Sequence, residues 1–361
     1  MPSDPSAEVT LRYAHHDDFA AVGKFLEVLG GPFFRERLPK HSLEEFYRWK
    51  YSQNPLGEAV VAIAVAGGEV VSVVAATPKK IQVGTLTLDA YELGDFLTDD
   101  RFRKQGLFSK LIDMVCAKAA SLGAAFAYVR PNAVSFPILA RHLSFFQPAQ
   151  METRRFVVLS RSLANKFGIP ESLLRMTGMD WIARRVALPG RESNGLRVEP
   201  ISRFGPETDQ LWQTARRDYR FLIARESAYL NWRYVDTPTP YRVWLARRNR
   251  EAVGFSVTFV SPGTATGHIL DQFTAAGDLS AARSLLHTSF REFLAAGVRS
   301  ISAWVLPEQR VLPAALLLRR ACLFSQPPPL HFAIRLLNPS LSQRDFPPSA
   351  WHLSLGDFDG A

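Results

Sequence analysis

A turn of basic residues and glycine between a strand and a helix is the segment of this sequence best suited to chemistry. An apolar strand pattern ends near Leu97, the run Arg103-Lys104-Gln105-Gly106 follows, and a helical pattern begins near Ser109. In such a turn, several backbone N–H groups and the positive end of the helix dipole converge on one concavity, which suits a phosphate or pyrophosphate. Two basic side chains add positive charge, and Gly106 lets a ligand approach the backbone closely. The turn therefore predicts an anion-binding site.

The size and charge of the chain limit the remaining possibilities. It has 361 residues, of which 47% are hydrophobic and 21% charged, as in globular proteins. Single cores rarely grow beyond about 250 to 300 residues, so two domains are expected. The formal net charge is +9, but the basic residues form scattered pairs such as Arg184-Arg185, without zinc-finger spacing, an RNP-like motif or a basic tail. We therefore expect no nucleic-acid partner.

Cysteine use and hydropathy favour a cytoplasmic location. Cys116 and Cys322 are too few for a secreted disulfide framework, and both are predicted to be buried free thiols. The N-terminus lacks a signal-peptide pattern, and no stretch approaches 18 uninterrupted apolar residues. We expect a cytoplasmic protein without a membrane span. No metal-ligand spacing is present, so no metal site is expected.

An internal repeat organises the chain. The segment EFYRWKY at 45–51 recurs as AYLNWRY at 228–234, and in both copies a proline stands six residues after the Trp. A strand–turn–strand pattern follows each copy, at 59–76 and at 241–259. The matching hairpins indicate a duplicated unit.

Each copy continues as strand, helix, strand, helix and strand, which predicts mixed α/β sheets flanked by helices. The closing strands are expected at 154–159 and 330–337. A tail rich in Pro and Ser is expected to wrap the surface or fray. The predicted parts are an N-terminal domain at 1–159, a helical connector at 160–195, a C-terminal domain at 196–337 and the tail at 338–361.

The basic turn resembles the acyl-CoA loop of the GNAT (Gcn5-related) N-acyltransferases, which reads R/Q-x-x-G-x-G/A. Arg103 and Gly106 match this pattern, whereas Phe108 stands where Gly or Ala is usual. One branch of the family shares this departure in a loop that reads R-G-x-G-I-F. The same branch carries a W-K-Y…N-P element, similar to that of the first repeat here, and a P-N step, similar to Pro131-Asn132.

The resemblance covers about 9–159 and, more weakly, 196–337. It implies two tandem GNAT-like domains, each a mostly antiparallel twisted sheet flanked by helices. It also implies acetyl-CoA or another acyl-CoA as co-substrate, with pantetheine between splayed strands at 92–98 and 124–130. The equivalent loop of the second copy, 271–280, has no basic residue, so that copy is expected to be degenerate. By resemblance, the residues that bind acyl-CoA are Phe96, Leu97, Thr98, Arg103, Lys104, Gln105, Gly106, Leu107, Phe108, Ser109 and Asn132.

The resemblance also implies a carboxylate base on the fourth strand. Glu92 and Asp95 are the candidates. Side-chain alternation predicts that they point to opposite faces, and Asp95, just before the loop, is favoured. Many members place a Tyr acid on the helix after the fifth strand, but no Tyr lies there, leaving Ser135 and His142 as nearby polar residues. The aromatic residues that could line an acceptor pocket are Trp49, Tyr51 and Tyr91.

The leading hypothesis is an N-acetyltransferase that moves the acyl group of acetyl-CoA, or a related acyl-CoA, to a primary amine of a small molecule. An amino sugar, an amino acid or a biosynthetic intermediate would each fit as acceptor. One alternative is an acyltransferase that draws on long-chain acyl-CoA or acyl-carrier protein, and another is a non-catalytic CoA-binding protein. The duplication predicts a monomer in which the two units form an intramolecular pseudo-dimer.

Overall fold

The structure is a computed structural model that describes residues 8–30, 43–178, 180–181, 195–261, 263–275, 277–306, 324–347 and 350–359. Cys322 and part of the predicted connector lie outside these residues. The strands are β1 (Val9–Tyr13), β2 (Val60–Ala66), β3 (Glu69–Val83), β4 (Leu86–Thr98), β5 (Phe126–Val129), β6 (Phe146–Val157), β7 (Leu196–Ile201), β8 (Phe221–Ile223), β9 (Arg242–Arg248), β10 (Glu251–Ser261), β11 (Thr266–Thr274), β12 (Ser300–Val305) and β13 (Phe324–Leu336). The helices are α1 (Phe19–Gly30), α3 (Leu43–Ser52), α4 (Leu107–Ser121), α5 (Ser135–His142), α6 (Leu159–Phe167), α7 (Glu171–Met176), α9 (Pro206–Ala215), α10 (Ser227–Tyr234) and α11 (Leu279–Ala295).

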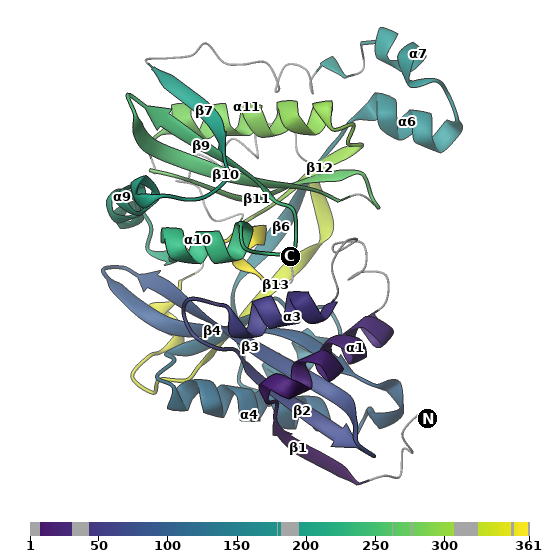
Figure 1. The fold of residues 1–361 in the computed structure, drawn as a ribbon, viewed down its shortest axis with the longest axis vertical. Coiled ribbons are helices and arrows are strands. Elements are labelled where there is room, and N and C mark those ends of the chain that lie inside the picture. The colour runs from purple at the N-terminus through teal and green to yellow at the C-terminus, as the bar shows by residue number, and fades with distance from the viewer. Residues whose placement is uncertain are drawn as a thin grey trace.

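The first half folds as a meander followed by a crossover. Strands β1 to β4 pair antiparallel in chain order, and α4 then returns the chain so that β5 runs parallel to β4. Helices α1 and α3 cover one face of this sheet and α4 the other (Figure 1). The apolar face of α4, from Leu107 to Ala119, packs on the alternate residues of β2 and β3 that point to its side.

The second half repeats this order. Strands β9 to β11 pair antiparallel, and α11 leads to β12, which runs parallel to β11. Helix α11 covers one face, and α10, which carries the second copy of the Trp motif, precedes the meander as α3 does in the first half (Figure 1). The predicted mixed α/β architecture is confirmed.

The closing strands of the two halves are exchanged. Chain order assigns β6 to the first half and β13 to the second, yet β6 pairs with β12 and β13 pairs with β5. The two exchanged strands also pair with each other, so the described strands form one 13-stranded sheet. The expected assignment of these strands is therefore wrong. Hydrophobic alternation specifies which face of a strand is buried, and it carries no information on a pairing partner far away in the sequence.

The two copies of the Trp motif meet where the halves join. Trp49 and Trp232 stack with ring centroids 4.9 Å apart, and each indole N–H donates to the backbone carbonyl of the other Trp, at 3.0 and 3.3 Å. Their tyrosines also behave alike, since Tyr51 donates to Asp95 and Tyr234 to Asp271, three residues before the ends of β4 and β11. The repeat thus forms a reciprocal contact between the halves.

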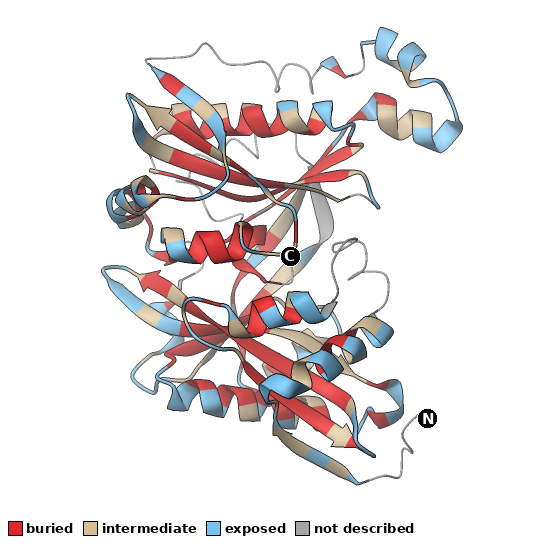
Figure 2. Cartoon of the chain, in the orientation of Figure 1, coloured by how far each residue is buried: buried red, intermediate tan, exposed pale blue. Residues whose placement is uncertain are grey.

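The C-terminal segment lies inside the molecule. Every residue from Trp351 to Asp359 is buried, and the segment runs between the two halves, where Figure 2 shows it and α10 in red. Trp351 stacks on Phe221 and Tyr128 donates to the backbone carbonyl of Asp357. The expectation that the tail wraps the surface or frays is wrong for this part. Its Pro and Ser content predicts irregular backbone, whereas its Trp, Leu and Phe residues determine its burial.

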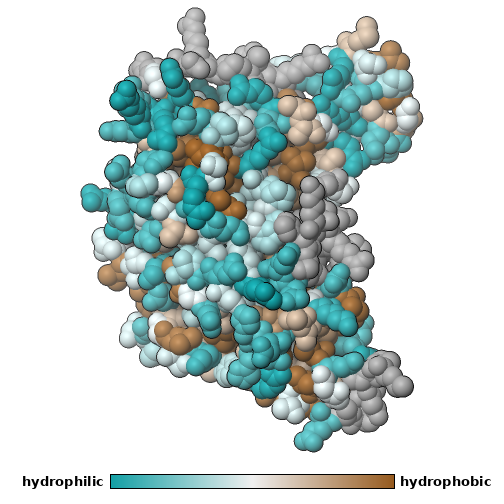
Figure 3. All heavy atoms as spheres, viewed as in Figure 1, coloured by the Kyte–Doolittle hydropathy of each residue, from teal (hydrophilic) through white to brown (hydrophobic). Residues whose placement is uncertain are grey.

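The predicted connector begins as α6 and α7, which project from one corner and are mostly exposed (Figure 2). On the face shown in Figure 3, apolar residues form separate patches among hydrophilic ones. Cys116 is a buried free thiol, as predicted. Across the described residues, no helix has the length and apolar character needed to span a membrane.

His352 makes the C-terminal segment sensitive to acid. Both ring nitrogens are buried and have no hydrogen-bond partner among the described residues. Burial, aided by the charge of Arg225, holds the pKa of His352 well below its usual value. The folded protein keeps this ring neutral, whereas the unfolded chain binds a proton below about pH 6.5. Stability from this group is therefore present above about pH 6.5 and is lost as the pH falls, by about 2 kcal/mol at pH 5.

We expect His352→Leu to reduce the loss of unfolding free energy between pH 7 and pH 5 by that amount, as measured by urea denaturation at each pH. His142→Leu is the control, because His142 is exposed. Equal pH dependence in the wild type and in His352→Leu would show that His352 is not the acid-sensitive group.

Candidate active site

The turn before α4 leaves the N-terminus of that helix open. Gly106 is the N-cap residue, with a φ of +73° and no side-chain capping hydrogen bond. Lys104 has a φ of +64°, so the turn passes twice through the left-handed region. Because no side chain caps this terminus, its N–H groups and the positive end of the helix dipole are available to an anion.

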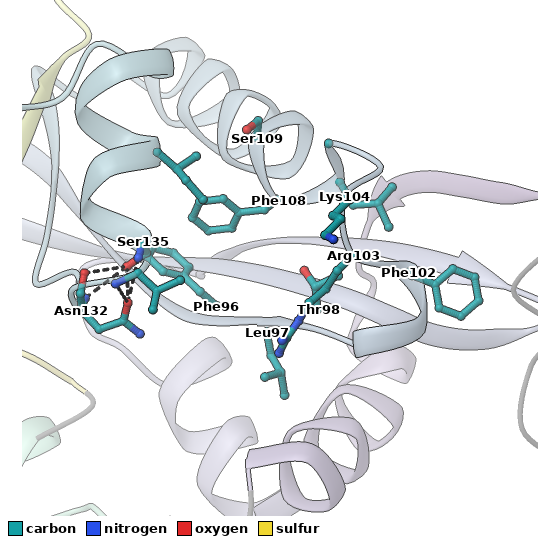
Figure 4. Close-up of a pocket in the computed structure, with 14 residues that line it drawn as sticks. Phe96, Leu97, Thr98, Phe102, Arg103, Lys104, Phe108, Ser109, Asn132 and Ser135 are labelled. Carbon is teal, nitrogen blue, oxygen red and sulfur yellow. Dashed lines mark hydrogen bonds between the residues drawn. The ribbon is translucent and has the colours of Figure 1, made fainter.

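A cavity of about 620 Å³ lies over this turn, between the end of β4 and the beginnings of α4 and α5 (Figure 4). The cavity is lined by every residue that the resemblance assigns to acyl-CoA binding, except Gln105. The role of these residues in binding stays a prediction. We call it the donor cavity. Its lining residues are Phe96, Leu97, Thr98, Phe102, Arg103, Lys104, Gly106, Leu107, Phe108, Ser109, Asn132, Val134, Ser135 and Ile138.

Strand β4 carries a bulge beside this cavity. Its pairing with β3 slips by one residue, so that Asp95 and Phe96 together oppose a single residue of β3, and Asp95 has a φ of +54°. Strict alternation predicts that Glu92 and Asp95 point to opposite faces, but both line one cavity. The prediction is wrong because a one-residue bulge reverses the alternation of side chains beyond it.

Strands β4 and β5 separate at the bulge. Their parallel pairing ends at Leu93 and Val129, where β5 itself ends. Beyond Leu93, the edge of β4 that faced β5 has no strand partner among the described residues. Residues 94–98 line the space that opens there, so unpaired backbone N–H and C=O groups are available to a ligand.

A second, polar cavity of about 420 Å³ adjoins the donor cavity, and we call it the polar cavity. The two share Phe96, Leu97, Asn132 and Ser135. Four charged side chains line the polar cavity, namely Lys50, Glu92, Asp95 and Arg130. An uncapped helix N-terminus and a cluster of charged side chains are thus joined through the split between β4 and β5.

Glu92 is the carboxyl group in the polar cavity whose surroundings favour proton uptake near neutral pH. Both of its oxygens accept the backbone N–H of Asp359, at 2.9 and 3.0 Å, and Lys79 Nζ lies 3.4 Å from Oε2. Burial raises the pKa of Glu92 to about 8, the charge of Asp359 adds to this rise, and Lys79 and Lys50 oppose it. A carboxylate with such a pKa suits general-base chemistry.

Asp359 carries the permanent negative charge of this buried cluster. Burial opposes its ionisation, but Lys79 and Arg233 outweigh burial and hold the pKa of Asp359 below its ordinary value. Lys79 Nζ lies 2.6 Å from both of its oxygens, and Thr77 donates to it as well. Glu92 is therefore the member of the pair that exchanges a proton.

Asp95 is instead held in a closed buried pair. It accepts hydrogen bonds from Lys50 Nζ at 2.7 Å and from the Tyr51 hydroxyl at 2.8 Å. These donors compensate its charge and tie α3 to the bulge. The geometry therefore favours Glu92 over Asp95, the reverse of the preference drawn from the sequence.

Comparison with known proteins agrees with this arrangement. Residues 17–141 match a family model described as an acetyltransferase (GNAT) domain. This match covers about a third of the chain and identifies a GNAT acetyltransferase domain in it. The match supports an acyltransferase, and enzymes of this superfamily use acyl-CoA. A search of curated proteins finds no match.

Several solved structures share the GNAT fold over most of both chains. A probable N-acyltransferase of unknown function from Enterococcus faecalis V583 aligns with a TM-score of 0.61 at 11% identity, covering 91% of this chain and 72% of that one. A GCN5-related N-acetyltransferase from Anabaena variabilis ATCC 29413 gives 0.62 at 12%, covering 92% and 73%. Saccharomyces cerevisiae N-myristoyltransferase with bound myristoyl-CoA gives 0.62 at 12%, covering 98% and 93%. At these identities, the likeness shows the fold.

The aromatic residues expected in an acceptor pocket lie in the core of the GNAT fold, and neither cavity is lined by them. Trp49 is used in the stack with Trp232, Tyr51 holds Asp95, and Tyr91 packs in the core beneath α4. These two cavities therefore do not support a place for the three rings in an acceptor pocket, which stays a prediction.

In the GNAT-like second half, α11 takes the place that α4 has in the first half, and its N-terminus is capped by a side chain. Asp278 caps α11 by accepting the N–H of Ala281, and Arg248 binds the Asp278 carboxylate at 2.8 and 3.0 Å. A carboxylate of the protein thus occupies the place that an incoming phosphate would take. This supports the expectation that the second copy does not bind CoA.

Ser135, one of the two polar residues considered for the general acid of a GNAT reaction, lines both cavities. His142 is exposed and lines neither. The Asn132 carboxamide oxygen accepts the N–H groups of residues 134 and 135, so it caps α5 at the edge of the donor cavity (Figure 4). Within the described ranges, no group of three or more His, Cys, Asp or Glu side chains is placed to hold a metal ion.

Sequence reasoning missed Lys79, Arg130 and the segment that ends at Asp359. Lys79 follows an apolar run in β3 as an ordinary strand-end lysine would, and Arg130 reads as a residue that leaves a strand. The only available signal for Arg130 was its place directly before the Pro131-Asn132 step. Nothing in the sequence indicates that a segment 267 residues from Glu92 would cover it.

Proposed function

We propose that the protein transfers an acetyl group from acetyl-CoA to the primary amine of a small molecule by direct attack. The observation that supports this most is the junction of the two cavities at Phe96, Leu97, Asn132 and Ser135. A donor bound along the first cavity would present its thioester at this junction. An amine in the polar cavity would meet the thioester there.

In this proposal, the pyrophosphate of CoA binds the open N-terminus of α4, with Arg103 and Lys104 adding charge. The pantetheine amides bind the unpaired edge of β4, and a backbone N–H there polarises the thioester carbonyl. Glu92 takes a proton from the amine, whose nitrogen forms the new C–N bond. The C–S bond then breaks, and the thiolate of CoA leaves with a proton from solvent or Ser135.

A longer acyl donor, on CoA or on acyl-carrier protein, is the second candidate. Phe96 and Phe108 meet in the donor cavity with ring centroids 5.4 Å apart, and so form an apolar wall that an acyl chain could follow. Comparing kcat/KM for acetyl-CoA, myristoyl-CoA and acyl-carrier protein separates the two. Acetyl-CoA affinity without thiol release on any amine would support a non-catalytic CoA-binding protein.

The donor site is tested by calorimetric titration of acetyl-CoA into the wild type and into Gly106→Glu. We expect one site per chain in the wild type and an affinity at least about 100-fold lower in the variant, because its carboxylate enters the phosphate position. Arg103→Ala should lose about tenfold, because this side chain is exposed in the free protein and pairs there with Asp100.

Gly123→Glu is the matched control. Gly123 lies just beyond the other end of α4, has a φ of +90° and, like Gly106, has no atom within 4 Å of an added Cβ. Both variants therefore carry the same backbone strain and the same added charge. Equal loss of affinity in both variants, or none in Gly106→Glu, would count against the donor site.

A further inference from the structure

Among the described residues, one cation of the polar cavity has no counter-ion bound to it. Lys50 and Asp95 bind each other, and Glu92 accepts the N–H of Asp359 and lies near Lys79. Arg130 differs, because it has no hydrogen bond or ion pair within the part of the chain that the structure describes. Its guanidinium donors are thus available to a ligand that enters the cavity.

A tryptophan of the second half of the molecule packs against the guanidinium of Arg130. Arg130 Cζ lies 4.9 Å from the ring centroid of Trp304 on β12, and Trp304 in turn packs near Phe358. Stacking on an indole fixes the plane of a guanidinium and leaves the N–H groups at its edge free. Burial lowers the pKa of Arg130, against the attraction of Glu92, which shows that water solvates this cation poorly. An anion that binds it would form strong charge-assisted hydrogen bonds.

The register of β4 and β5 places Arg130 beside Glu92. Glu92 pairs with Tyr128 in the parallel ladder, so their side chains lie on one face of the sheet. Arg130 follows Tyr128 by two residues, directly after the end of β5. It lines the polar cavity together with Glu92, close enough for the charge of Glu92 to act on it. A molecule whose amine and carboxylate are a few bonds apart can therefore reach both groups at once.

We propose that the acyl acceptor is a small amino acid whose carboxylate binds Arg130 while its amine faces Glu92. The inference rests on the proposed function and defines the chemistry of its acceptor. A molecule with a carboxylate close to its amine matches both groups, because the carboxylate can bind Arg130 while the amine faces Glu92. An amine that has no carboxylate leaves Arg130 without a counter-ion. The side chain of the amino acid extends into the remaining space of the cavity.

An acyl donor that carries its own carboxylate, such as succinyl-CoA, presents the same chemistry to Arg130. The acceptor is favoured because Arg130 lines the polar cavity and not the donor cavity. Changing Arg130 distinguishes the two sources of the carboxylate. If the carboxylate belongs to the acceptor, the variant loses activity with amino acids; if it belongs to the donor, the variant loses activity with succinyl-CoA.

The first experiment measures thiol release from acetyl-CoA with the twenty standard amino acids and with their amides, which keep the amine and lose the carboxylate charge. We expect kcat/KM for the best amino acid to exceed that for its amide at least about 100-fold. In Arg130→Gln this ratio should fall to near one, mainly through a higher KM, and Arg130→Lys should retain part of it. Arg203→Gln is the control, because Arg203 makes an exposed ion pair on the second half.

The second experiment measures binding without turnover. Each amino acid and each amide is tested for its effect on the thermal unfolding midpoint of the wild type and of Arg130→Gln. We expect at least one amino acid to raise the midpoint of the wild type, through selective binding to the folded state. Its amide should have no such effect, and neither ligand should raise the midpoint of the variant.

The outcomes separate the inference from the proposed function. Acyl transfer without preference for amino acids over amides, or with the preference intact in Arg130→Gln, overturns the inference and leaves the function standing. Amino-acid binding that needs Arg130, without thiol release, supports the anion site and counts against the function. No stabilisation by any amino acid overturns the inference. Loss of succinyl-CoA turnover alone in Arg130→Gln assigns Arg130 to the donor.

Discussion

Replacing Glu92 by Gln is expected to lower kcat by about 10² to 10⁴-fold, the usual contribution of a general base. Gln keeps an oxygen that can accept the N–H of Asp359 but cannot take up a proton. The donor cavity does not include Glu92, so acetyl-CoA affinity should stay within about twofold of the wild type. Stopped-flow or steady-state thiol release, together with calorimetry, measures the two effects separately.

The pH profile makes this test specific. The raised pKa of Glu92 means that its carboxyl is protonated below about pH 8 and cannot act as a base there. The kcat/KM of the wild type should therefore rise with pH up to about 8 and then level off. Glu92→Gln should lose this rise of kcat/KM with pH, which we call the pH limb. Asp95→Asn should keep the pH limb, because Asp95 is held in its pair with Lys50.

Asp89→Asn is the control, since Asp89 is an exposed carboxylate on the same strand and faces Lys80. It should retain both the rate and the pH limb. A Glu92→Gln protein that is folded, binds acetyl-CoA and turns over within tenfold of the wild type with the limb intact would show that another group is the base.

Replacing Asp359 by Ala is expected to lower the free energy of unfolding by about 3 to 5 kcal/mol. Lys79 and Arg233 are both buried, and Asp359 lies 2.6 and 3.6 Å from their nitrogens. Without it, Lys79 keeps Glu92 at 3.4 Å, and Arg233 keeps its hydrogen bonds to the backbone carbonyls of Gly356 and Phe358 but loses its carboxylate. Denaturation in guanidinium chloride measures this loss. The same change removes a like charge beside Glu92, so the pKa of Glu92 should fall and the pH limb of kcat/KM should move to lower pH.

Asp236→Ala is the matched control, because Asp236 pairs with Arg203 on the surface and its loss should cost less than about 1 kcal/mol. Adding Lys79→Met to Asp359→Ala should recover part of the stability, since the unpaired buried ammonium is then removed. Equal losses for Asp359→Ala and Asp236→Ala would contradict the view that the buried cluster holds the C-terminal segment in place.

The sequence predicted the features that depend on neighbours along the chain. The Trp repeat and the hairpins after it showed the duplicated order of elements, because alternation and turn residues are local signals. The open turn before α4 was predicted for the same reason, since Arg103, Lys104 and Gly106 directly precede that helix. The exchange of β6 and β13 was missed, because pairing partners are chosen by the whole fold.

The rest of the site depends on contacts that chain order does not encode. The bulge at Asp95 turned the expected base into a structural pair, although Asp carries no strong signal for a positive φ. Glu92 owes its raised pKa to burial first and to the charge of Asp359 next, and the guanidinium of Arg130 lies over the ring of Trp304. Glu92 and Asp359, like Arg130 and Trp304, lie more than 150 residues apart in the sequence, so only the folded chain brings them together.

The exchange of closing strands bears on how this chain folds as the ribosome makes it. When the first half has left the exit tunnel, β5 has no neighbour on its free edge, because β13, at Phe324–Leu336, has yet to be synthesised. Its sheet stays open there, and β6 has no partner until β12 appears. Domains that fold as they emerge bury their edges early. The sheet of this chain can instead close only after β13 has been synthesised, and until then it has an exposed strand edge that a chaperone or a second nascent chain could meet first.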